Sequence, residues 1–263
     1  MSTRERTGVG SLALLLAGWS VALEAQSIGE RVQEVRDGAV RFSFAARPGV
    51  CGSGQSWWTD ARSGNRYGSF TTQDVEIDCA AGPVRVVVTR SQLRTTSIRT
   101  YVGGRWSAQA TGVDLGTVTT RDASAFLLSV AESGDAGPAE AAMAAATLAD
   151  SVDVWPTLLR VARAPARPLS VRKQAVFWVA QAASDKVVGA LSELADQDPN
   201  VDIRKQAVFA LSQRPANEGV PALMRIARDR QTAAPVRKSA YFWLGQSNDP
   251  RALAFLEAAL LAP

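Results

Sequence analysis

The sequence contains no histidine and only two cysteines among its 263 residues. Without histidine there is no Ser-His-Asp triad, no Cys-His dyad, no imidazole general base and no histidine metal site. Two thiols are too few for a four-cysteine zinc site or for an iron–sulfur cluster. We therefore expect no cofactor and no metal, and carboxylates are left as the main source of acid–base chemistry.

Strong charge and long apolar runs are also scarce. Hydrophobic residues make up 46% and charged residues 21% of the chain, and the formal net charge is +4. These values are typical of a globular protein. No basic run with interleaved aromatic residues is present, so nucleic acid is not an expected partner. Beyond the N-terminal segment no stretch approaches 18 uncharged apolar residues, and we expect no stable membrane insertion of the mature chain.

One apolar run stands near the N-terminus. Ser11–Leu23 carries no charge and follows Arg4 and Arg6. The run is too short to cross a bilayer core of about 30 Å at about 1.5 Å per residue. The pattern predicts a signal peptide over residues 1–22, cleaved after Ala22 or after Ala25, and a periplasmic or secreted protein. An uncleaved membrane anchor and a buried helix are the alternatives.

The two cysteines, Cys51 and Cys79, fit an exported protein. In an oxidising compartment the only two cysteines are expected to form a disulfide. Two buried thiols in a cytosolic protein are the alternative interpretation. The predicted signal peptide favours the disulfide.

The two halves of the chain differ in composition. Residues 27–120 are rich in Gly, Thr, Val and Arg and alternate as strands do, whereas residues 122–262 are rich in Ala and Leu at helical spacing. The turn-rich stretch Ser133–Pro138 separates them. We predict a β-rich domain over residues 27–133 and a helical domain over residues 138–262.

The β-rich half has a clear local pattern. A short helix is expected at Ile28–Arg36, and strands are expected at Val40–Ala45 and Thr95–Val102. The apolar residues of Asp74–Cys79 and Val84–Arg90 coincide if Cys79 pairs with Val84 in an antiparallel hairpin, which places the disulfide on the buried face. The pattern predicts a small antiparallel sheet.

Two groups in this half are candidate binding residues. The acidic row Asp74, Glu76 and Asp78 either holds calcium or forms a solvated sheet face. The tryptophans Trp57, Trp58 and Trp106 either pack in the core or bind a glycan.

The second half contains an internal repeat. The segments Val171–Trp178, Ile203–Ala210 and Val236–Trp243 match at offsets of 32 and 33 residues. A second set keeps the same step and comprises Trp155–Ala162, Val188–Ala195, Val220–Ala227 and Leu253–Leu260. With an earlier helix at Ala139–Ala149, these segments predict four two-helix units that bury a continuous core only when stacked.

One unit reads Ile203-Arg204-x-x-Ala207-x-x-Ala210-Leu211 after Asp196-x-Asp198-Pro199. This pattern resembles the short HEAT repeats, including those described as phycobilisome-lyase HEAT-like, over about residues 138–262. The first unit lacks the Val-Arg pair, and Trp178 and Trp243 replace a small residue. The resemblance implies an all-α superhelical solenoid of four two-helix repeats. Together with the antiparallel β-rich domain and its one disulfide, the predicted fold class is a multi-domain α+β chain. The resemblance says little about function.

The repeat brings charged and aromatic residues into register. The three sets are the arginines Arg172, Arg204 and Arg237, the lysines Lys173, Lys205 and Lys238, and the phenylalanines Phe177, Phe209 and Phe242. The basic sets either form a stripe for an anionic partner, or the arginines bond turn carboxylates and the lysines are solvated. The candidate carboxylates are Asp196, Asp198, Asp202 and Asp229. The phenylalanines either pack between repeats or bind a partner.

The second helices of the units are expected to line the inner surface of the solenoid. Their polar residues include Arg160, Arg163, Glu193, Arg225, Arg228 and Glu257, and the arginines among them are candidate partner-binding residues. The apolar end Ala258–Pro263 is either covered by the N-terminal domain or by a partner, or it forms a homodimer. The leading hypothesis is an exported, non-enzymatic scaffold that binds a protein of the cell envelope. The alternatives are a glycan-binding module, or a lyase-type or carboxylate enzyme or enzyme accessory.

Overall fold

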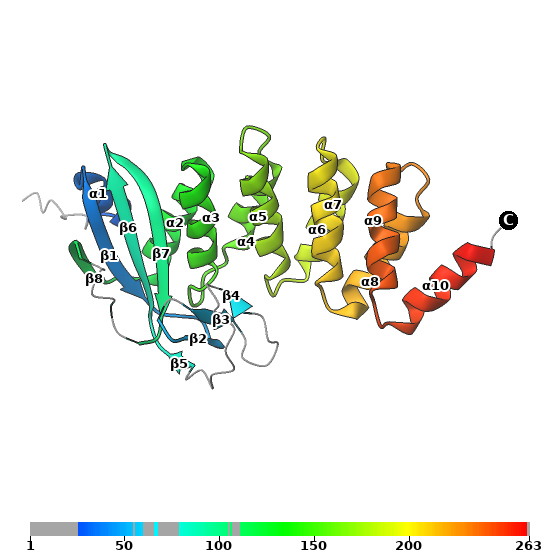
Figure 1. The fold of residues 1–263 in the computed structure, drawn as a ribbon, viewed down its shortest axis with the longest axis horizontal. Helices are drawn as coiled ribbons and strands as arrows, with labels where there is room; N and C mark the ends of the chain where they lie inside the picture. Colours follow the sequence, from blue (N-terminus) through cyan, green and yellow to red (C-terminus); the bar gives the residue numbers. More distant parts are fainter. Residues whose placement is uncertain are drawn as a thin grey trace, which may run out of the picture.

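The computed structural model describes residues 26–54, 56–59, 66–67, 79–104, 106 and 111–261. Within these residues, two small sheets at the N-terminal side are followed by a row of helices (Figure 1). The predicted signal peptide lies outside the described residues, and so does the acidic row Asp74, Glu76 and Asp78. No helix of the described part is long and apolar enough to cross a membrane.

The first sheet has the strand order β7-β6-β1-β8. Its strands are β1 (Gly38–Phe44), β6 (Val84–Ser91), β7 (Arg94–Val102) and β8 (Val113–Thr117). All neighbours are antiparallel except β1 and β8, which run parallel. Period-two alternation buries Phe42 and Phe44 of β1 beside Val86 of β6 on one face. The short helix α1 (Ile28–Glu34) precedes this sheet and begins with a capping box between Ser27 and Glu30.

The predicted hairpin between residues 74–79 and 84–90 is wrong. Both edges of β6 are occupied, because Val86 pairs with Phe42 of β1 on one side and with Thr100 of β7 on the other. The alternation correctly identified the buried face of β6. It carried no information about which strand lies beside it.

The second sheet has the order β4-β3-β2-β5. Its strands are β4 (Arg66–Tyr67), β3 (Trp57–Thr59), β2 (Val50–Gly52) and β5 (Ala80–Ala81). The Cys51–Cys79 disulfide is confirmed, with a Cα–Cα distance of 5.2 Å. It connects β2 to the residue before β5, and both cysteines are half-buried rather than on the buried face of a hairpin. Gly103 lies where the two sheets meet, at φ 64°, and a Cβ there would overlap the carbonyl oxygen of Gly52.

The helices follow the predicted order along the chain. They are α2 (Thr120–Ser133), α3 (Ala136–Ala146), α4 (Trp155–Arg163), α5 (Leu169–Ala180), α6 (Lys186–Gln197), α7 (Val201–Ser212), α8 (Ala216–Arg228), α9 (Ala234–Gly245) and α10 (Pro250–Leu261). The most extensive contacts join α2 to α3, α4 to α5, α6 to α7 and α8 to α9. The packed pairs are therefore offset by one helix from the units counted in the sequence. The last described helix, α10, stands at the end of the array (Figure 1).

The array has two rows of helices. The helices α3, α5, α7 and α9 form the odd row, and α2, α4, α6, α8 and α10 form the even row. Neighbours in the odd row approach each other more closely than neighbours in the even row, and α4 and α6 have very little direct backbone contact. The expectation that α4, α6 and α8 line the inner surface of the solenoid stays a prediction.

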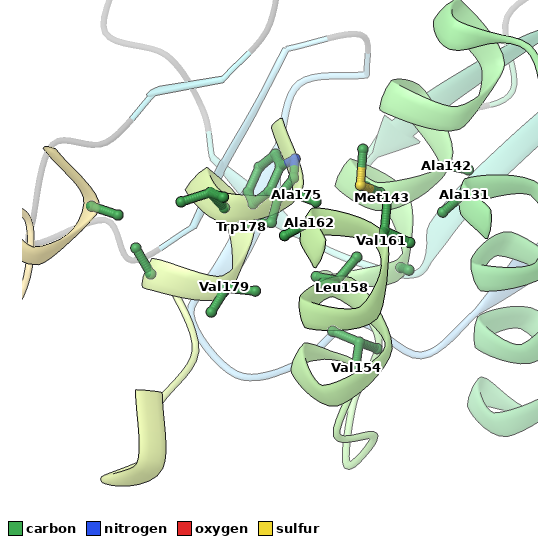
Figure 2. Packing of buried hydrophobic residues seen from close by; sticks show 14 of the residues in the cluster. Ala131, Ala142, Met143, Val154, Leu158, Val161, Ala162, Ala175, Trp178 and Val179 are labelled. Carbon is green, nitrogen blue, oxygen red and sulfur yellow. The ribbon is translucent and has the colours of Figure 1, made fainter. Parts of the chain in front are cut away.

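One continuous core runs from the first sheet through the helices. Phe126 of α2 packs edge-on against Phe42 of β1, and α3 contacts β7. The first sheet is therefore covered both by α2, which ends at Ser133, and by α3, which begins at Ala136. Figure 2 shows Trp178 and Ala175 of α5 beside Ala162 of α4 within this core. The small residues Ala142, Ala175, Ala207 and Ala240 recur at the repeat spacing and are fully buried. Their size allows the close approach of the odd helices.

Candidate functional site

The arginines of the repeat register hold the turns between helices. The Nε of Arg172 donates to the carbonyl oxygen of Ala162 at 2.7 Å, and the Nε of Arg204 donates to that of Ala195 at 2.7 Å. Arg237 donates through Nη1 to the carbonyl oxygen of Thr232 at 2.6 Å. Each arginine thus satisfies a carbonyl group at or just beyond the end of the preceding helix. These three side chains form no basic stripe.

Arg172 also forms the one deeply buried ion pair among the described residues. Its Nη2 lies 2.5 Å from Oδ2 of Asp198, and both side chains are about 95% buried. Of the four carboxylates predicted to bond this arginine register, Asp198 alone does so in the described structure. Asp196 instead pairs with Arg225, and Asp229 accepts from the backbone and side chain of its own turn.

Two of the three lysines of the register share a single acidic neighbour. The Nζ of Lys173 lies 3.7 Å from Asp202, and that of Lys205 lies 3.8 Å from the same carboxylate. Lys238 is exposed and has neither an ion pair nor a hydrogen bond to any residue that the structure describes. Long, half-exposed contacts of this kind contribute little stability. The odd row therefore presents net positive charge that the array itself does not neutralise.

The phenylalanines follow the lysines by four residues and lie on the same helix face. Phe177 is half-buried and contacts Trp178 edge-on at a centroid distance of 5.0 Å. Phe209 is half-buried against Trp243 of α9, also at 5.0 Å. Packing between repeats accounts for Phe209, whereas Phe242 is 57% exposed beside Lys238.

The arginines of the even row connect consecutive helices. Arg160 of α4 pairs with Glu132 of α2 at 2.8 Å, and Arg163 of α4 pairs with Glu193 of α6 at 2.5 Å. Arg225 of α8 pairs with Asp196 of α6 at 2.9 Å. Arg228 of α8 stands over the ring of Phe255 of α10, 4.7 Å from its centroid. The candidate arginines thus bridge the wider gaps of this row, and three of them are matched by carboxylates.

Two carboxylates in the turns between helices accept hydrogen bonds from residues close to them in the chain. The Arg251 guanidinium and backbone N–H donate to Asp249 and lower the pKa of that carboxyl to about 2. The N–H of Gln231 and the hydroxyl of Thr232 lower the pKa of Asp229. Arg251 also donates to the carbonyl oxygen of Ala216 at 3.0 Å, which ties the start of α10 to the start of α8.

The tryptophans of the β-rich part do not form a binding platform. Trp57 and Trp58 are only 6% and 8% exposed, which confirms core packing, one of the two expected alternatives, for both residues. Trp106 is half-buried between the guanidinium groups of Arg41 and Arg85, at 5.1 and 5.8 Å. In the described residues no group of three or more acidic or cysteine side chains is placed to hold a metal ion.

Sequence reasoning missed one buried charge. Arg90 continues the row Val84, Val86 and Val88 on the face of β6 that packs against the helices, and it is only 6% exposed. The signal was present in the sequence, because an arginine at the fourth place of an apolar alternation breaks the pattern of a buried strand face.

Comparison with known proteins agrees with the geometry of the helical array. A family model described as HEAT repeats matches residues 155–241 and 188–263. No curated protein matches the chain. The C-terminal part of this protein is therefore built of HEAT repeats, as the register of its arginines and alanines indicated. The β-rich part lies outside the matched residues.

Proposed function

We propose that this protein is a non-enzymatic scaffold that binds another protein through the odd row of its HEAT array. The observation that carries the proposal is the lysine register, in which Lys173 and Lys205 share the carboxylate of Asp202 and Lys238 has no ionic partner among the described residues. HEAT repeats commonly mediate protein–protein contacts, and stacked repeats present an extended preformed surface of this kind.

The chemistry of the row favours an acidic partner with an apolar anchor. The three lysines repeat along adjacent helices and attract carboxylates. Phe242 offers an exposed ring next to Lys238, where an apolar side chain of the partner would be removed from water. A peptide or loop that alternates acidic and apolar residues matches this arrangement.

Selection of peptides on the immobilised protein tests the proposal. We expect enrichment of peptides with several acidic residues and at least one large apolar residue. A triple variant, Lys173→Glu with Lys205→Glu and Lys238→Glu, should lose these peptides by at least tenfold in affinity. The matched control changes the exposed residues Arg99, Arg121 and Lys186 to Glu and should retain them. Equal loss in both triple variants would show that only overall charge matters and would refute the proposed surface.

We propose that the protein is exported, and the N-terminal sequence and the disulfide together support this proposal. Arg4 and Arg6 precede the apolar run Ser11–Leu23, and Cys51 and Cys79 form a bond that persists in an oxidising compartment. Mass spectrometry of the protein from its native source should give a first residue of Leu23 or Gln26. The mass should lie two hydrogens below that of the reduced chain. An intact Met1 with two free thiols would contradict export.

We also propose that the exposed side of α10 pairs with a second copy of the chain. Leu260 and Leu261 are 86% and 84% exposed, and Leu253 is 59% exposed. Every other even helix packs extensively on an odd helix, whereas α10 packs less extensively on α9. Sedimentation should show a monomer–dimer equilibrium that Leu260→Glu with Leu261→Glu shifts to monomer. A concentration-independent monomer in the unchanged protein would refute this contact.

A further inference from the structure

A pocket of about 480 Å³ lies between α1, α2 and the turn that joins β6 to β7. Its apolar wall comprises Leu93, Phe126 and Val130, and Ser129 and Thr95 line it with hydroxyl groups. This pocket is at the far end of the molecule from α10 and contains no residue of the lysine register (Figure 1). It is therefore independent of the proposed protein-binding row.

Arg90 lines the pocket from strand β6. Arg90 is only 6% exposed, yet its Nε has no hydrogen-bond partner in the described structure. Its Nη2 donates to the carbonyl oxygen of Leu93. A guanidinium carries five N–H donors, and the donor on Nε is buried without an acceptor among the described residues.

No carboxylate among the described residues forms an ion pair with Arg90. The nearby Asp135 pairs with Arg94 at 2.9 Å. Asp37 accepts from the backbone N–H of Gln92 at 2.8 Å on the other side of the turn. A buried charge is costly unless it is paired and hydrogen-bonded. Arg90 is thus a buried cation beside an open pocket without an anion.

Support of the turn does not require a charge at this position. Gln92 and Leu93 have φ values of 50° and 67°, in the region that favours glycine, and the bond from Arg90 to Leu93 steadies them. A neutral amide supplies the same single donor without the desolvation of a cation. The charge of Arg90 therefore calls for a second explanation.

We propose that this pocket binds a carboxylate attached to an apolar body. Arg90 pairs with the carboxylate, and Leu93, Phe126 and Val130 contact the apolar body. A small monocarboxylic acid and the C-terminal carboxylate of an apolar peptide share this chemistry. Arg94 and Asp135 at the pocket lining neutralise each other, so Arg90 sets the preference for an anion.

Calorimetric titration of the full chain with two acids and their amides tests this site. The probes are hexanoate and N-acetyl-L-leucine, with hexanamide and N-acetyl-L-leucinamide as uncharged counterparts. We expect saturable binding of at least one acid, at least tenfold tighter than its amide. Preference for hexanoate assigns a small acid, and preference for N-acetyl-L-leucine assigns a chain terminus. Binding of neither acid, or equal binding of acid and amide, overturns the proposal.

Two variants locate the site. Arg90→Gln should weaken acid binding at least tenfold, whereas Arg99→Gln on the exposed side of β7 should leave it unchanged. Ser133→Trp places a large side chain at the exposed edge of the pocket, keeps Arg90, and should also weaken binding tenfold. This second variant decides the matter if Arg90→Gln fails to fold. Full affinity in either folded variant overturns the proposal.

Discussion

The odd and even rows of the helical array use the same basic residue types for different purposes. In the even row, Arg160, Arg163 and Arg225 each reach a carboxylate on a neighbouring helix. In the odd row, the helices approach closely through fully buried alanines, and the contact from Lys173 of α5 to Asp202 of α7 is longer, at 3.7 Å. The spacing of the helices therefore decides whether a surface cation is used inside the array or is left for a partner.

The comparison also separates two kinds of arginine. Arg172 lies in the interior of the array and combines a backbone bond with a buried carboxylate, whereas Arg163 is 42% exposed in its side chain. A buried pair is costly to break on one side, and an exposed pair is cheap to lose. The two rows should therefore respond very differently to single substitutions.

The largest effect is expected at the buried pair. Asp198→Ala leaves the Arg172 guanidinium buried without its carboxylate and should lower the free energy of unfolding by about 3–5 kcal/mol. Chemical denaturation measures this change. Asp185→Ala, at an exposed aspartate before α6, is the control and should change stability little. Similar losses in both variants would contradict the distinction between buried and exposed charges.

A smaller effect is expected from overfilling the odd row. Ala207→Leu inserts a larger side chain where α7 meets its neighbours and should cost about 1–3 kcal/mol. Ala254→Leu on the exposed side of α10 adds the same atoms in the even row. Thermal unfolding of both variants should show a loss for Ala207→Leu only, and a neutral Ala207→Leu would refute close packing in the odd row.

A still smaller effect is expected from the bridges of the even row. Arg163→Met removes the pair with Glu193 and should cost about 1 kcal/mol or less. The difference from the unchanged protein should shrink further at high salt, because exposed pairs are screened. Denaturation at two ionic strengths measures it. A loss comparable to that of Asp198→Ala would mean that the even row depends on its ion pairs.

The smallest effect is expected at low pH, where Asp249 becomes protonated. Hydrogen bonds from Arg251 lower the pKa of Asp249 from 3.8 to about 2 in the folded protein. A lowered folded pKa gives a stabilising contribution that is complete above the unfolded pKa and disappears as the pH falls toward 2. NMR signals from the start of α10 should therefore change between pH 4 and pH 2. Asp249→Asn should remove this dependence, and persistence of the same transition in the variant would assign it elsewhere.

The sequence predicted the helical array well because its signal is repeated. Ala142, Ala175, Ala207 and Ala240 recur at one spacing, and each is buried at a helix contact. A helix that is predicted wrongly in one repeat unit is corrected by the matching segments of the other units. The pairing of helices was less accessible, because the sequence period is the same whichever helix is counted first.

The sheet was harder to predict because strand pairing is not local. Val84, Val86 and Val88 correctly marked a buried face, but β6 pairs with β1, whose residues lie 40 to 52 positions earlier in the chain. The roles of the arginines were also hidden. Arg172 and Arg204 donate to backbone carbonyl groups, which exist at every position and leave no mark in the sequence.

The central claim is that the lysines of the odd row bind a partner and the arginines of the even row do not. It is tested by measuring the affinity of one selected acidic peptide for two triple variants. One changes Lys173, Lys205 and Lys238 to Glu, and the other changes Arg160, Arg163 and Arg225 to Gln. We predict at least tenfold weaker binding with unchanged thermal stability for the lysine variant, and nearly unchanged binding for the arginine variant. Weaker binding in the arginine variant, with full affinity in the lysine variant, would contradict the assignment of the two rows.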